Sequence, residues 1–118
     1  MKRDDFAGRP GDEQRDCMVR AFTVLTQRPY PEIHAAFKDA GRKNGRATPR
    51  KVSLKVADKY KVKLNYARIS VARFLDDMQY VDRVVAVING HAFAVTRGVI
   101  ADYVKVKPRS IIKFFYTI

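Results

Sequence analysis

Three residues of this chain have the side-chain chemistry of a nucleophile, a base and an acid: Cys17, His91 and Asp102. Cys17 is the only cysteine, and it lies where the polar run 11–16 meets apolar residues at helical spacing, which predicts a helix that begins at the thiol. Unpaired backbone N–H groups at a helix start favour a thiolate and can stabilise an oxyanion. Cys17 is therefore a candidate nucleophile, and a packing cysteine is the alternative.

His91 and Asp102 are predicted to lie together on neighbouring strands. His91 follows an Asn-Gly pair between two apolar runs, a strong hairpin signal, so it should begin the returning strand at the rim of the sheet. The turn at residues 96–98 should then bring Asp102 back near the start of that strand. A carboxylate there would hold the tautomer of the imidazole and stabilise its charged form. The pattern predicts a Cys/His/acid site for acyl transfer, although a loop-bonded histidine and an edge-strand acid are the structural alternatives.

Four helices followed by an antiparallel sheet are expected to position these residues. Helical spacing of apolar residues predicts helices over about 16–27, 31–40, from 48 onward and after Ser70. Alternating or continuous apolar runs predict strands near 62–68, 84–88, 91–95, 99–102 and 111–118. Asp16, Thr48 and Ser70 are the expected N-caps. The order indicates an α+β fold with the helices packed on one face of the sheet.

The length of 118 residues corresponds to one domain, which we expect over residues 12–118. Residues 1–11 are expected to be a flexible arm, because Gly8, Pro10 and Gly11 disfavour regular structure and only Phe6 could anchor it. A single cysteine forms no internal disulfide, and no apolar run approaches the roughly 20 residues of a membrane span. We therefore expect a soluble, cytoplasmic protein with no signal peptide and no membrane partner.

The net charge of +12 favours acidic partners, and most of it lies between residues 41 and 63, where nine Lys or Arg residues accompany one acid, Asp58. Candidate contacts to nucleic acid or to an acidic protein are Arg42, Lys43, Arg46, Lys51, Lys55 and Lys59. A solvated helix face is the alternative, because no aromatic RNA-binding motif and no set of zinc ligands accompanies these residues. Two histidines and one cysteine, far apart in the sequence, argue against any metal site.

The segments 16–21, 90–95 and 98–102 resemble the papain-like cysteine peptidase superfamily, most of all its small members from phage and bacterial genomes. The similarity covers about residues 12–102, and the segment 29–43 also looks like those small proteins. The resemblance implies that Cys17 attacks a carbonyl carbon, that His91 is the base and that Asp102 orients it. It also implies a papain-like fold and no cofactor.

The chain departs from that superfamily in two places. Met18 follows the nucleophile where the family often has glycine, and Gln14 lies closer to Cys17 than the family's oxyanion glutamine does. Gln14 is the candidate oxyanion donor by resemblance, with Asp12 or a backbone N–H group as the alternative.

Two functions therefore stand as hypotheses. The first is a thiol-dependent acyl-transfer enzyme, most simply a small cysteine peptidase with a peptide or protein substrate, although the superfamily also contains deamidases, transglutaminases and acyltransferases. The second is a catalytically degenerate basic module, a phage-type effector that binds nucleic acid or a host protein through residues 41–63. A phage-encoded protein would act in the host cytoplasm.

Overall fold

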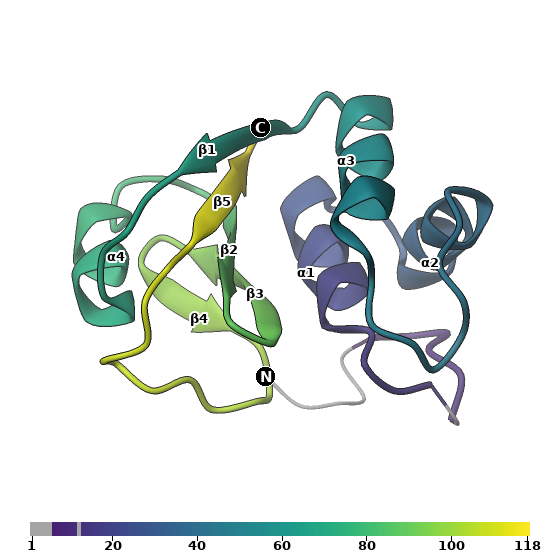
Figure 1. Ribbon diagram of the computed structural model, residues 1–118, viewed down its shortest axis with the longest axis horizontal. Coiled ribbons are helices and arrows are strands. Elements are labelled where there is room, and N and C mark those ends of the chain that lie inside the picture. The colour runs from purple at the N-terminus through teal and green to yellow at the C-terminus, as the bar shows by residue number, and fades with distance from the viewer. Residues whose placement is uncertain (1–5, 12) are drawn as a thin grey trace.

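The computed structural model describes residues 6–11 and 13–118, and within these ranges four helices and a five-stranded antiparallel sheet form an α+β fold (Figure 1). The helices are α1 (Cys17–Thr26), α2 (Tyr30–Asp39), α3 (Arg50–Lys59) and α4 (Val71–Asp77). The strands are β1 (Lys63–Tyr66), β2 (Val84–Ile88), β3 (His91–Thr96), β4 (Val99–Ala101) and β5 (Phe114–Thr117). The predicted α+β class is confirmed.

The sheet has the strand order β1-β5-β2-β3-β4, so the last strand of the chain lies between β1 and β2. Strands β2 and β3 form a hairpin in which Ile88 pairs with His91 across the Asn-Gly turn, as the sequence predicts. In the next hairpin Ala94 pairs with Ala101, so Asp102 follows directly after the paired part of β4. These two registers bring the beginning of β3 and the end of β4 to the same end of the sheet.

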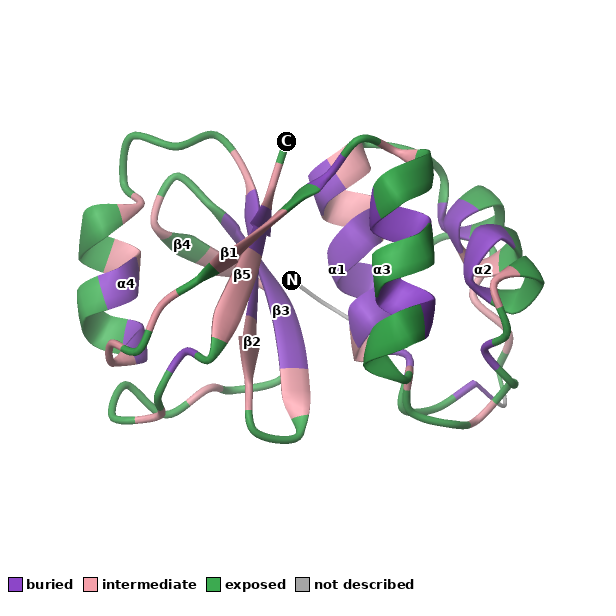
Figure 2. Cartoon of the chain, turned by 45° about the horizontal axis from the view of Figure 1, so that its top comes forward, coloured by how far each residue is buried: buried purple, intermediate pink, exposed green. Residues whose placement is uncertain are grey.

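Helices cover both faces of the sheet, which corrects the expectation that they lie on one face. Helices α1, α2 and α3 lie on one side and α4 lies on the other (Figure 1). Alternate residues of β2 and β3 enter two separate hydrophobic clusters: Val85 and Ala94 face α1, whereas Val84 and Phe93 pack with α4. Because both faces of these central strands are apolar, both need a covering layer. Figure 2 shows the resulting buried strands between the helices.

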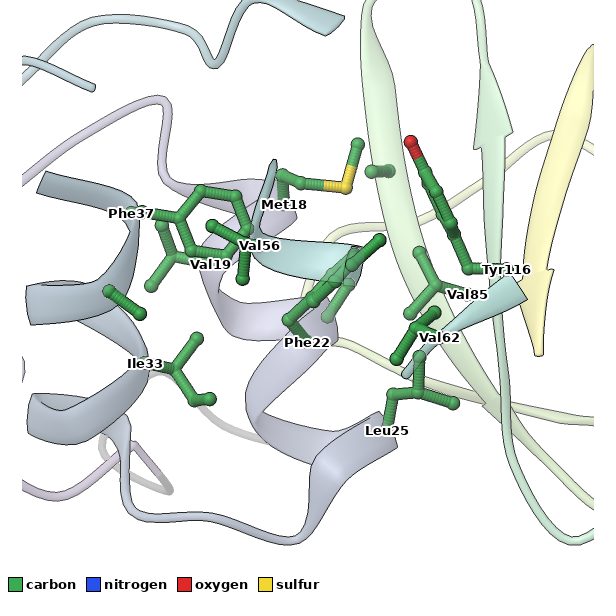
Figure 3. Packing of buried hydrophobic residues seen from close by; sticks show 14 of the residues in the cluster. Met18, Val19, Phe22, Leu25, Ile33, Phe37, Val56, Val62, Val85 and Tyr116 are labelled. Carbon is green, nitrogen blue, oxygen red and sulfur yellow. The ribbon is translucent and has the colours of Figure 1, made fainter. Parts of the chain in front are cut away.

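Phe22 of α1 lies at the centre of the larger cluster (Figure 3). Its ring packs edge-on against Phe37 of α2 and against Tyr116 of β5, each with a centroid distance of 5.3 Å. The hydroxyl group of Tyr116 in turn is hydrogen-bonded to Ser53 of α3 at 3.1 Å. These contacts fix α1 between the other helices and the sheet, and so fix the position of Cys17 at its first turn.

Two of the three predicted N-caps differ in the structure. Asp16 occupies the N-cap position of α1, but its side chain makes no capping hydrogen bond because it is bound by arginines, as described below. Helix α3 begins at Arg50 with Pro49 at the N-cap, one residue later than predicted for Thr48. Ser70 caps α4 as predicted, since its hydroxyl oxygen accepts a hydrogen bond from the Arg73 amide at 3.2 Å.

Residues 6–11 of the expected arm pack against the domain, while residues 1–5 lie outside the described residues. The Phe6 side chain is buried and meets Tyr30 edge-on at 6.2 Å. The guanidinium group of Arg9 forms an ion pair with Asp16 at 2.7 Å. None of the helices formed by the described ranges has the length and apolar character needed to cross a membrane.

Candidate active site

Cys17, His91 and Asp102 lie together, at the beginning of α1, the beginning of β3 and the end of β4. The Nε2 atom of His91 is 2.8 Å from an Asp102 carboxylate oxygen. The His91 ring also interacts with the Cys17 thiol, an interaction that lowers the pKa of the thiol and raises the pKa of the imidazole. The imidazole therefore bridges the thiol and the carboxylate, in the order that a Cys/His/Asp site requires.

The backbone of β3 supplies a further contact to the sulfur. The Ala92 amide donates a hydrogen bond to Cys17 Sγ at 3.4 Å. This contact exists because the first turn of α1 packs against the beginning of β3, and α1 has more contact with β3 than with any other element. The thiol is only partly exposed, so it lies at a helix–sheet junction, not on an open surface.

The ionisation of Cys17 and His91 is coupled. Burial raises the pKa of the Cys17 thiol, but the hydrogen bonds from His91 and from the Ala92 amide outweigh it, so the pKa lies below its ordinary value. Burial lowers the pKa of His91, whereas the hydrogen bonds to Asp102 and Cys17 raise it, with a net result of about 9. Both shifts act in the same direction, toward a thiolate beside an imidazolium.

Asp102 is held from its other side by Arg20, a residue that the sequence analysis missed. The Arg20 guanidinium of α1 donates through Nη1 to Asp102 Oδ1, and its Nε donates to Asp16 Oδ1 at 3.2 Å. It also lies over the ring of Tyr103, 4.3 Å from the centroid. The side chains of Arg20 and Asp102 are only 6% and 3% exposed, so this is a buried ion pair. The i, i+4 spacing of Asp16 and Arg20 was the one sequence signal of it.

Asp16 extends the same network away from the thiol. Its carboxylate accepts hydrogen bonds from Arg9 at 2.7 and 2.8 Å and from the Tyr30 hydroxyl at 2.7 Å. Burial raises the pKa of Asp16, but these two donors and the charge of Arg20 bring it well below its usual range. The buried carboxylates of Asp16 and Asp102 are thus matched by two buried guanidinium groups.

A second buried network holds the loop that leads to Cys17. The Glu13 carboxylate, with no exposed side-chain surface, accepts hydrogen bonds from both Nη atoms of Arg42 at 3.0 and 3.1 Å. It also contacts His34 Nε2 at 2.7 Å and accepts from the Gly45 amide at 2.8 Å. Burial raises the pKa of Glu13, but Arg42, His34 and Gly45 together lower it to about 2.

This second network corrects one predicted binding residue. Arg42 is buried and paired with Glu13, so it does not belong to an exposed basic surface. The other predicted residues are all exposed, on the loop before α3 and on the outer side of that helix: Lys43, Arg46, Lys51, Lys55 and Lys59. We call these five residues the basic surface.

Gln14, the candidate oxyanion donor, belongs to the Glu13 network by its observed contacts. These contacts are made by its backbone: the backbone amide donates to Glu13 Oε1 at 3.0 Å, and the backbone carbonyl accepts from Arg42 at 3.3 Å. Its exposed side chain extends toward Gly45 and lines a polar cavity of about 390 Å³ that also borders Arg20. The alternative donor, Asp12, lies outside the described residues. The backbone amide of Ala92, at the sulfur, is a donor that sequence reasoning did not identify.

The described part of the chain brings no three His, Cys, Asp or Glu side chains together in a way that could hold a metal ion. Comparisons with protein-family models, with curated proteins and with solved structures find no match to this chain.

Proposed function

We propose that the protein is a thiol-dependent acyl-transfer enzyme, most simply a small papain-like cysteine peptidase. The observation that carries the proposal is the position of His91, 2.8 Å from Asp102 and next in the chain to Ala92, whose amide donates to Cys17 Sγ at 3.4 Å. A packing cysteine needs no such partner, whereas a nucleophilic cysteine needs a base that is itself oriented.

The reaction follows from this geometry. The Cys17 thiolate attacks the carbonyl carbon of the substrate, and backbone N–H groups at the beginning of α1 stabilise the oxyanion. The His91 imidazolium protonates the leaving amine, whose C–N bond breaks, and a thioester remains on Cys17. His91, now neutral, takes a proton from water or from an acceptor amine, which attacks the thioester and releases the thiolate. Asp102 orients His91 throughout and stabilises its charged form.

The pH dependence of Cys17 alkylation by iodoacetamide tests this proposal. The wild-type thiol is expected to titrate well below the reference value of about 8.5, and in His91→Ala its pKa should rise, so that the rate at neutral pH falls about tenfold. A control is Lys55→Ala, a change on the exposed side of α3, which should leave the titration of the thiol unchanged. A thiol with an ordinary titration in both wild type and His91→Ala would identify Cys17 as a packing residue.

The basic surface supports a second candidate function, the binding of nucleic acid. All five of its residues are exposed, and three of them, Lys51, Lys55 and Lys59, follow one another along a single side of α3. We expect affinity for a duplex oligonucleotide that falls steeply with salt, and a loss of about tenfold or more in a variant with all three lysines changed to Glu. Binding that is insensitive to these changes would eliminate the basic surface as the binding site.

A further inference from the structure

A cavity of about 710 Å³ lies at the end of the sheet where the β2–β3 turn is, between the beginning of α3 and the strands β1 and β5. Its size is in the range typical of ligand sites. Phe114, Ile88 and Ile111 give it an apolar lining. Ile111 is 48% exposed and Tyr66, at the margin, is 71% exposed, so a considerable apolar surface is open to solvent.

The polar part of this cavity is cationic. Arg50, Arg68 and Lys113 line it, and none of its described lining residues is an acid. Arg50 is stacked over the Phe114 and Tyr66 rings at 4.9 and 5.5 Å and bonds the Tyr66 hydroxyl. Lys113 contacts the amide oxygen of Asn89 at 3.5 Å. The cavity therefore offers positive charge together with apolar surface, which suits a ligand with carboxylates and aliphatic groups.

The cavity adjoins the proposed catalytic site through the β2–β3 hairpin. Ile88 and Asn89 line it, and Ile88 is the register partner of His91. A ligand in the cavity would contact Ile88 of β2, and the residue paired with Ile88 on β3 is the proposed base, His91. This proximity is what a substrate-binding site of the Cys17 centre would require.

We propose that this cavity binds an acidic peptide segment of the substrate, an inference that rests on the proposed function. Carboxylates of the segment would pair with Arg68 and Lys113, and its aliphatic side chains would cover Ile88 and Ile111. Single-stranded nucleic acid would instead need free aromatic faces for its bases. In this cavity Arg50 already lies over one face of the Tyr66 ring and one face of the Phe114 ring, which leaves less aromatic surface for base stacking and favours the peptide.

Fluorescence anisotropy with the Cys17→Ala protein tests the inference without any turnover. The probes are a short fluorescein-labelled peptide that alternates Glu with Leu, the same peptide with Gln in place of Glu, and labelled oligothymidine. The Glu peptide should bind most tightly. The double variant Arg68→Glu, Lys113→Glu should weaken its binding about tenfold or more. Lys55→Glu with Lys59→Glu makes the same charge change on α3, outside the cavity, and should weaken it less than about twofold.

Three results would overturn the inference: equal binding of the Gln peptide, an equal loss in the Lys55 and Lys59 variant, or tighter cavity-dependent binding of oligothymidine. The proposed function is tested separately by iodoacetamide alkylation of the Arg68 and Lys113 variant with Cys17 present. If the Arg68 and Lys113 variant loses peptide binding while the pKa of Cys17 stays as low as in the wild type, the cavity is the source of selectivity. An ordinary thiol pKa in the wild type contradicts the catalytic proposal whatever the peptides do.

Discussion

Replacement of Glu13 by glutamine is expected to lower the free energy of unfolding by about 3–5 kcal/mol. The reason is that Arg42, whose side chain is 1% exposed, would remain in the interior without a counter-charge. The amide could accept only part of the hydrogen bonds that Arg42, His34 and Gly45 now donate or share. Urea unfolding followed by circular dichroism measures the difference.

The matched control is Glu32→Gln, which removes a carboxylate of the same type from an exposed ion pair. Glu32 lies 3.8 Å from Arg28, and both side chains are open to solvent. Such pairs contribute about 0–1 kcal/mol, so this variant should unfold close to the wild type. If the Glu13 and Glu32 variants lost equal stability, the burial of the Glu13 network would not be the cause.

The same carboxylate predicts how stability depends on pH. The pKa of Glu13 is about 2 in the folded protein, against 4.5 for an ordinary glutamate. The unfolded chain therefore binds the proton more readily, so stability rises with pH across this window. The contribution of Glu13 is fully present above pH 4.5 and is lost as the pH falls toward 2. In Glu13→Gln the pH dependence of unfolding should be correspondingly weaker, although Asp16 acts in the same direction.

The elements of the fold and the three central site residues could be predicted because each has a local signal. A lone cysteine at a helix start and a histidine after an Asn-Gly turn are visible in the sequence, and the short β3–β4 turn fixes the position of Asp102. The covering of both sheet faces was harder to predict. A continuous apolar run such as residues 84–88 shows that a strand is buried, but it does not show which helix covers which face.

The burial of the ion pairs could not be predicted, because charged residues are mostly exposed and sequence spacing alone does not identify the buried exceptions. Arg42 belongs to a run of basic residues, and only the tertiary position of Glu13, 29 residues earlier, distinguishes it from its exposed neighbours. Arg20 likewise lies on the side of its helix opposite the apolar stripe of Met18, Phe22 and Leu25, which by pattern alone indicates a surface position. It is buried because two carboxylates, Asp16 and Asp102, converge on it from opposite sides.

Replacement of Arg20 by methionine should therefore affect both stability and the thiol. The change would leave Asp102 with one charged partner fewer and would remove one of the two guanidinium groups at Asp16. We therefore expect the free energy of unfolding, measured in urea, to fall by about 3–5 kcal/mol. The charge of Arg20 also lowers the pKa of Cys17, so that pKa should rise in the variant. The pH profile of alkylation measures this second effect, which a purely structural role would not produce.

The conservative variant Arg20→Lys separates the two effects. Its ammonium group keeps the positive charge near Cys17, so the thiol should titrate close to the wild type. It lacks the planar fork with which Arg20 bonds Asp16 and Asp102 at once, so most of the stability should still be lost. If Arg20→Met instead kept both its stability and its alkylation profile, Asp102 would be positioned by His91 and the Tyr103 backbone amide alone. The buried arginine would then play no part in the thiol chemistry that we propose.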